Sequence, residues 1–189
     1  MSRLTRLLKR SERGATLVEF AFIFTFLLML AIGAFEYGMA LRDWQSVTIA
    51  TREGARVAAS AANYQAADCT ILEATAGALQ SFRVGNIDFV TIYKSDEDGT
   101  FPGSGSLAAV YRPAGSGDTP VPECPFWTVH SAASDWQPDD RLNVFGEPYW
   151  IGVRLEYSHP WQTNFLFWTG SAQWTDDAVF RIEPPPPNI

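Results

Sequence analysis

One carboxylate lies where a charge is costly. From Ala15 to Phe35 the chain reads ATLVEFAFIFTFLLMLAIGAF, and Glu19 is its single ionisable side chain. A carboxylate within an apolar segment loses its hydration, so it needs a partner or a place near the segment's end. Close to a helix start, the positive end of the helix dipole can also offset its charge. Glu19 is therefore the first candidate for a role beyond packing.

The chain has two cysteines, Cys69 and Cys124, and neither lies in a C-x-x-C or metal-binding motif. An even number of cysteines in an exported domain favours a disulfide, which for a loop of this size contributes ~4 kcal/mol in the chain-entropy model. Two free buried thiols are the alternative, because spacing alone does not establish proximity. A catalytic thiol is not expected.

Other polar groups give no catalytic or metal-binding pattern. S-D-E-D-G at 95–99 has oxygen ligands for calcium but lacks the later glutamate of an EF-hand, so an exposed turn between strands is expected. The pairs at 139–140 and 176–177 are expected in exposed turns as well. His130 and His159 are expected in separate loops. Because H-E-x-x-H, G-x-S-x-G, P-loop and G-x-G-x-x-G motifs are missing from the sequence, we expect no enzyme, no cofactor and no metal.

The elements that position these residues begin with residues 15–35. These twenty-one residues form a helix of about 30 Å, the thickness of a bilayer's hydrocarbon core, and large apolar side chains occur on all its sides. A transmembrane helix is therefore expected, and the lipid bilayer is its first partner. A signal peptide has a shorter apolar stretch, of about 7–15 residues.

Charge is distributed unevenly along the chain. Residues 1–14 hold five basic residues and one acidic residue, whereas residues 36–189 hold nine basic and nineteen acidic residues. The basic leader predicts a cytoplasmic N-terminus and an exported remainder by the positive-inside rule. The acidic exported part argues against nucleic-acid binding, which needs clustered Lys and Arg.

The exported part is predicted to be α+β, with the long N-terminal helix extending into a small head that has an antiparallel sheet. The helical pattern continues over 36–65, where Ala50, Gly54, Ala58 and Ala62 form a stripe of small residues against which a sheet could pack. The head is expected at 66–183, with a second helix at Ala67–Ser81 and three or four strands, at Ile87–Tyr93, Leu107–Tyr111, Tyr149–Tyr157 and Ala178–Ile182. Residues 184–189 form a proline-rich tail.

Aromatic side chains are dense between residues 161 and 174, with Trp161, Phe165, Phe167, Trp168 and Trp174. We expect them to fill the core of the head. An exposed adhesive or subunit-docking loop is the alternative interpretation, because aromatic side chains often anchor interfaces.

Three sequence motifs resemble those of one family. R-G-A-T-L-V-E-F-A (Arg13 to Ala21) resembles the processing site of class III prepilins, with the Glu-Phe pair of the tight-adherence (Tad) branch. A-T-R-E-G-A-R-V-A-A (Ala50 to Ala59) and D-D-A-V-F-R-I-E-P (Asp176 to Pro184) are similar to segments of TadE-like minor pilins. Flp major pilins are far shorter than this chain, and TadG-like proteins carry a large additional domain.

The resemblance implies a structural role. A prepilin peptidase would cut between Gly14 and Ala15 on the cytoplasmic face, and Glu19 with Phe20 would set the axial register of assembly. The protein would reside in the inner membrane as a single-pass protein with a periplasmic head. Inclusion in an extracellular pilus for adhesion and biofilm formation would follow, with other Tad pilins and an inner-membrane assembly platform as partners. An uncleaved single-pass anchor with a periplasmic binding head is the alternative function.

Overall fold

A computed structural model describes residues 4–61, 63–79, 82–96, 98–103, 107–114, 119–121, 124–130, 136–141, 149–165 and 168–182, with the backbone alone at 4–13 and 119–121. The chain divides into two compact units. The first comprises Met1–Ala40 with Trp161–Thr169, and the second comprises Leu41–Pro160 with Gly170–Ile189. The second unit is the head.

Helix α1 (Leu4–Ala61) contributes residues to both units. Proline is missing throughout its 58 residues, so no backbone N–H is lost from its hydrogen-bond ladder. The helix ends at Ala61, a few residues before the expected Gln65. Helix α2 (Ala67–Ala78) then begins at the predicted residue and ends three residues earlier than predicted.

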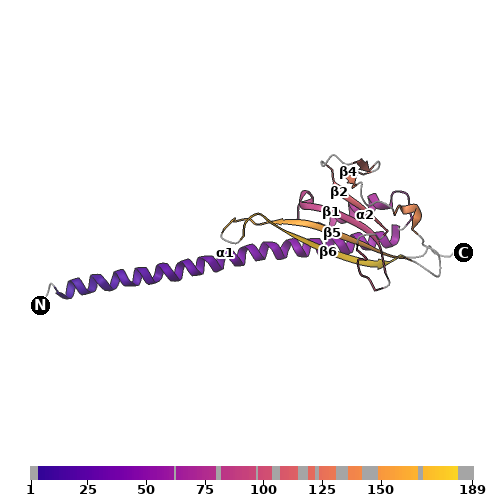
Figure 1. The fold of residues 1–189 in the computed structure, drawn as a ribbon. Helices are drawn as coiled ribbons and strands as arrows, with labels where there is room; N and C mark the ends of the chain where they lie inside the picture. Colours follow the sequence, from indigo (N-terminus) through magenta and orange to yellow (C-terminus); the bar gives the residue numbers. More distant parts are fainter. Residues whose placement is uncertain are drawn as a thin grey trace. The chain divides into compact units, whose positions relative to one another are not determined.

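Within the described part of the chain, six strands form one antiparallel sheet in the order β3-β4-β2-β1-β5-β6. Their bounds are β1 (Ile87–Ser95), β2 (Ala108–Pro113), β3 (Thr119–Val121), β4 (Cys124–Val129), β5 (Trp150–Pro160) and β6 (Ser171–Arg181). Two 3-10 turns, η1 (Val84–Asn86) and η2 (Pro138–Asp140), complete the elements. Figure 1 shows β1, β5 and β6 running side by side.

The prediction of three or four strands was too low, for two physical reasons. Strands β3 and β4 are short and contain Pro120 and Pro125, which interrupt the usual strand pattern. Strand β6 begins at Ser171 rather than Ala178, because it is an edge strand whose polar residues tolerate exposure.

The core of the head lies between the sheet and the helices. Alternate residues of β5 are buried, namely Ile151, Val153, Leu155 and Tyr157, as the pleat of a strand requires. The helices contribute small side chains from α1 and larger ones from α2, including Val47, Ala50, Ala55, Ala58, Ile71 and Leu72. The predicted packing of small helical residues is confirmed at Ala50, Gly54 and Ala58, which are all buried; Ala62 lies outside the described residues.

Gly54 marks the closest approach within this core. A Cβ at this position would lie 2.1 Å from Thr75 Oγ1 and 3.4 Å from Val153 Cγ1. The Thr75 hydroxyl already donates to the Ile71 carbonyl at 2.7 Å, which restricts its movement. Helix α1 can therefore pack so closely on α2 and β5 only with glycine here. The predicted α+β fold, a long N-terminal helix with a small antiparallel head, is confirmed.

Candidate functional site

The segment Gly14–Phe20 lies in regular helix within α1, and all of its side chains are exposed. A Cβ at Gly14 would meet nothing within 4 Å. Among the residues whose side chains the structure describes, none forms a hydrogen bond or ion pair with Glu19. The helix thus presents an accessible glycine and, five residues later, a carboxylate whose neighbours three and four residues along the helix, Phe22 and Ile23, are exposed apolar side chains.

The apolar stretch that follows is also uncovered. Every residue from Gly14 to Ala31 is exposed, and the stretch is long and apolar enough to cross a membrane. The Thr25 hydroxyl donates to the Ala21 carbonyl at 2.8 Å, which satisfies its hydrogen within the helix. This helix is consistent with a single-pass membrane anchor.

The aromatic residues at 161–174 divide between the two units, and the predicted core role is wrong for most of them. Trp161 and Trp168 are half-buried in the first unit, where their rings contact Tyr37. Phe165 is exposed, and Trp174 is the one described ring of the group that packs against the core of the head. Phe167 lies outside the described residues. Sequence density of aromatic residues does not reveal where the chain turns, and the turn here follows the end of β5 at Pro160.

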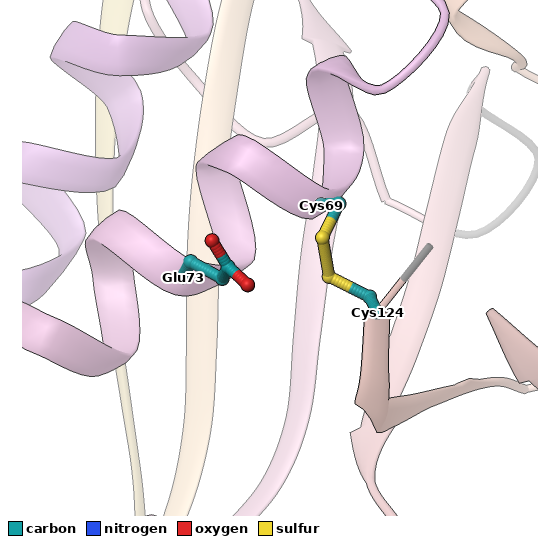
Figure 2. A group of neighbouring side chains, drawn as sticks. All are labelled: Cys69, Glu73 and Cys124. Atoms are coloured by element: carbon teal, nitrogen blue, oxygen red, sulfur yellow. A yellow bond between two sulfur atoms is a disulfide. The ribbon is translucent and has the colours of Figure 1, made fainter. Parts of the chain in front are cut away.

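Cys69 and Cys124 form a disulfide that joins α2 to β4, with a Cα–Cα distance of 5.5 Å. Figure 2 shows Glu73, one turn along α2, beside the two sulfur atoms. The three side chains offer atoms within 4.8 Å of one another. The disulfide uses both sulfurs as bonded atoms rather than thiolates, so a single exposed carboxylate is left for a cation. This cluster therefore serves as a covalent link.

A buried ion pair that the sequence did not predict lies beside this disulfide, because it involves Asp68, the residue before Cys69 in α2. Arg141, 1 % exposed, places its guanidinium 2.5 Å from Asp68 Oδ1, and the Tyr111 hydroxyl donates to Asp68 Oδ2. The guanidinium also lies 4.8 Å from the centre of the Trp136 ring. Burial and the neighbouring Asp68 carboxylate raise the pKa of Tyr111. No short-range motif joins residues 68, 111 and 141, so only the tertiary fold reveals the group.

His159 was predicted in a loop, and that prediction is wrong. It is fully buried in β5, its Nδ1 lies 2.7 Å from Asp43 Oδ2, and its ring stacks on Trp174 at 5.3 Å. His130 follows β4 and contacts Phe89, so the structure does not bring the two histidines together. The pair of buried His159 and partly exposed Asp43 links β5 to α1 within the head.

Asp176 and Asp177 were also predicted wrongly, because they lie in β6 and not in an exposed turn. Successive residues of a strand point to opposite faces. Asp176 accepts a hydrogen bond from the Thr51 hydroxyl of α1 at 2.6 Å, and Asp177 accepts one from the Tyr93 hydroxyl at 3.1 Å. Burial, followed by the Asp177 carboxylate, raises the pKa of Tyr93.

The other acidic clusters do lie in exposed turns. Asp139 and Asp140 are exposed in η2. Asp96 and Asp98 are exposed in the connection from β1 to β2, where Gly99 has a φ of 73°. The Ser95 hydroxyl there donates to the carbonyl of Thr100 at 2.9 Å, which links the two ends of the turn.

These features define a protein with an exposed apolar N-terminal helix and a disulfide-linked α+β head. The family model of TadE-like proteins matches residues 14–56, and the chain is TadE-like over this segment. The match begins at Gly14 and reaches past Gly54, so it contains the apolar stretch and part of the small-residue stripe. Comparisons with curated proteins and with solved structures give no match. TadE-like proteins of the Tad pilus system are structural and non-enzymatic.

Proposed function

We propose that the chain is the precursor of a minor pilin that a prepilin peptidase processes between Gly14 and Ala15. The observation that carries this proposal is the position of Gly14. It stands between a basic leader and an exposed apolar helix, at the first residue of the TadE-like match. Removal of residues 1–14 would leave the entire apolar helix on the mature subunit.

Glu19 would then act during assembly. The new terminal amine of Ala15 on a neighbouring subunit can offset the carboxylate, because opposite charges within an apolar environment attract strongly when water is excluded. That pairing fixes how far one helix slides along the next, while Phe20 packs beside it. The exposed apolar surface from residue 14 to 31 would be covered first by lipid and later by neighbouring helices.

The basic leader orients the chain in the inner membrane with its N-terminus in the cytoplasm and its head in the periplasm. The disulfide between Cys69 and Cys124 fits an oxidising compartment. Other Tad pilins and the inner-membrane assembly platform would be the partners of the mature subunit. Adhesion and biofilm formation by the assembled pilus follow from this role, which requires no catalysis.

Processing is tested with two matched glycine variants in cells that contain the prepilin peptidase. Gly14→Leu should block processing, because the peptidase must accommodate a small residue before the cut. Gly38→Leu introduces the same side chain at another open helical position, where a Cβ meets nothing within 4 Å, and should be processed normally. Equal processing of both variants would refute the assignment of Gly14.

Assembly is tested separately with Glu19→Val. This variant should be cleaved like the wild type but should be lost from sheared pilus fractions. Glu73→Val removes an exposed carboxylate from the head and serves as the control. Normal incorporation of the Glu19 variant would refute the proposed role of the carboxylate while leaving cleavage intact.

A further inference from the structure

The connection from β5 to β6 carries aromatic residues but no charge. It reads W-Q-T-N-F-L-F-W-T over residues 161–169 and belongs to the same compact unit as residues 1–40 of α1. A solvent-exposed hairpin connection usually contains charged or small polar residues. Four aromatic side chains among nine residues suggest an environment other than bulk water.

Contacts within this unit place the loop beside the part of α1 that runs from Gly33 to Tyr37. A Cβ on Gly33 would lie 3.2 Å from Trp168 Cη2, so the Trp168 ring lies against the last turn of the apolar stretch. The Tyr37 ring is 6.4 Å from the Trp161 ring and 6.4 Å from the Trp168 ring, in edge-to-face geometry. Three aromatic rings with polar groups thus meet where the apolar stretch ends at Phe35.

The loop is attached to the helix through its backbone. The Glu36 carboxylate is fully buried and accepts hydrogen bonds from the backbone N–H groups of Gln162, at 3.1 Å, and Thr163. Asn164 takes a left-handed φ of 48°, which asparagine tolerates better than most residues. These hydrogen bonds satisfy the Glu36 carboxylate and two backbone N–H groups of the loop, so they hold the loop beside Glu36.

We infer that residues 161–165, together with Trp168 and Thr169, form an interfacial anchor that lies in the lipid headgroup region at the end of the apolar helix distant from Gly14. Tryptophan and tyrosine favour this region because their rings are largely apolar while their N–H and O–H groups can bind water or headgroups. Phe165, exposed at 38 %, provides an apolar contact for the outer acyl chains. The anchor fixes how deep α1 sits.

This inference rests on the membrane insertion of α1, which is part of the proposed function, but it does not depend on cleavage. The lipid interface is favoured over a protein partner because the loop rings continue the apolar surface of the helix directly. The Trp168 contact at Gly33 lies inside the apolar stretch, and the Glu36 bonds immediately follow it.

The test uses the full chain in vesicles of phosphatidylethanolamine and phosphatidylglycerol. Environment-sensitive fluorophores are attached to single introduced thiols in Phe165→Cys, Thr169→Cys, Phe24→Cys and Asp139→Cys, since the disulfide leaves Cys69 and Cys124 unreactive. Nitroxide lipids labelled near the headgroup or deep in the acyl chain act as quenchers. Positions 165 and 169 should be quenched about twofold more by the shallow nitroxide than by the deep one. Position 24 should show the reverse preference, and position 139 should show neither.

The controls separate the possible failures. Quenching at position 24 together with readings at 165 and 169 as low as those at 139 would overturn the loop anchor and leave the transmembrane helix standing. An unquenched position 24 would overturn membrane insertion and the anchor with it. Protection of 165 and 169 from both nitroxide lipids and aqueous iodide would assign the loop to a protein contact and likewise overturn the inference.

Discussion

The two halves of α1 differ in the size and the exposure of their side chains, although they belong to one continuous helix. Between residues 14 and 31 large apolar side chains such as Phe22 and Leu27 are exposed, whereas between residues 47 and 59 small residues such as Ala50 and Ala58 are fully buried. Figure 1 shows the second half beside the strands of the head. Large apolar side chains are exposed in the first half, where lipid and neighbouring helices are the proposed contacts. Small side chains are required in the second half, because it packs against the chain's own sheet.

Charges follow the same division. Glu19 is an exposed carboxylate on the first half, whereas two less exposed carboxylates of the head are paired, Asp68 with Arg141 and Asp43 with His159. A paired buried charge belongs to the fold of the monomer. The exposed charge of Glu19 within an apolar surface is the group that the proposed pairing with a neighbouring subunit would use.

The largest expected effect on folding comes from breaking a buried pair in the head. Arg141→Met should lower the free energy of unfolding by about 3–5 kcal/mol, because it leaves the Asp68 carboxylate buried without its cation. Urea unfolding of the full chain in detergent, followed by tryptophan fluorescence, measures this change. The double variant with Asp68→Asn should recover part of the loss.

Removal of the Glu19 carboxylate from the first half of α1 should have a different effect on unfolding. Glu19→Val, measured in the same way, should leave the unfolding of the head unchanged, because Glu19 has no part in the head. A loss of comparable size in this variant would contradict the division of the helix into two halves.

A smaller effect is expected from adding one methyl group to α1. Gly54→Ala should destabilise the head by about 1–3 kcal/mol, because the new Cβ overlaps Thr75. Gly38→Ala adds the same atom where nothing lies within 4 Å and should be neutral or slightly stabilising, since alanine favours helix. Equal unfolding midpoints for the two variants would show that close packing at residue 54 is dispensable.

The smallest effect is an alkaline loss of stability in the head. Burial, followed by the carboxylates of Asp176 and Asp43, raises the pKa of Tyr157 from 10.0 to about 12. Between these values the unfolded chain releases a proton that the folded chain retains, so the free energy of unfolding falls as the pH rises from 10 to 12. The Tyr157 contribution is therefore fully present below pH 10.

Tyr157→Phe isolates this contribution. Among the residues that the structure describes, no group forms a hydrogen bond with the Tyr157 hydroxyl, so its removal should cost little at pH 8. The variant should become more stable relative to the wild type between pH 10 and 12 in urea titrations at each pH. A constant difference across that range would contradict the raised pKa.

Local sequence patterns were sufficient to predict the helices and strands that have a clear hydrophobic periodicity. The long helix, the start of α2 and the central strands β1 and β5 follow from helical or alternating periodicity, and the small-residue stripe correctly indicated close packing on α1. The resemblance carried by residues 13–21 and 50–59 agrees with the family match over 14–56. Each of these signals lies within a short stretch of chain.

Features that depend on distant residues were not predictable in this way. Asp68 and Arg141 are separated by a large part of the chain, and neither residue has a local signal that marks it as buried. His159 and Asp176 looked like loop residues because polar side chains are common in turns, yet their partners on α1, Asp43 and Thr51, satisfy them within strands. The role of Glu36 was also missed, because its two donors come from a loop more than a hundred residues away.

Processing at Gly14 is tested by the intact mass of the wild-type protein, extracted from membranes of cells that contain the prepilin peptidase. A mature chain that begins at Ala15 is expected, with residues 1–14 removed and the apolar helix retained. A chain that still begins at Met1 would contradict the pilin function and would favour an uncleaved membrane anchor. A chain that begins beyond Phe35 would show instead that the apolar segment is a signal peptide, removed before the head reaches its destination.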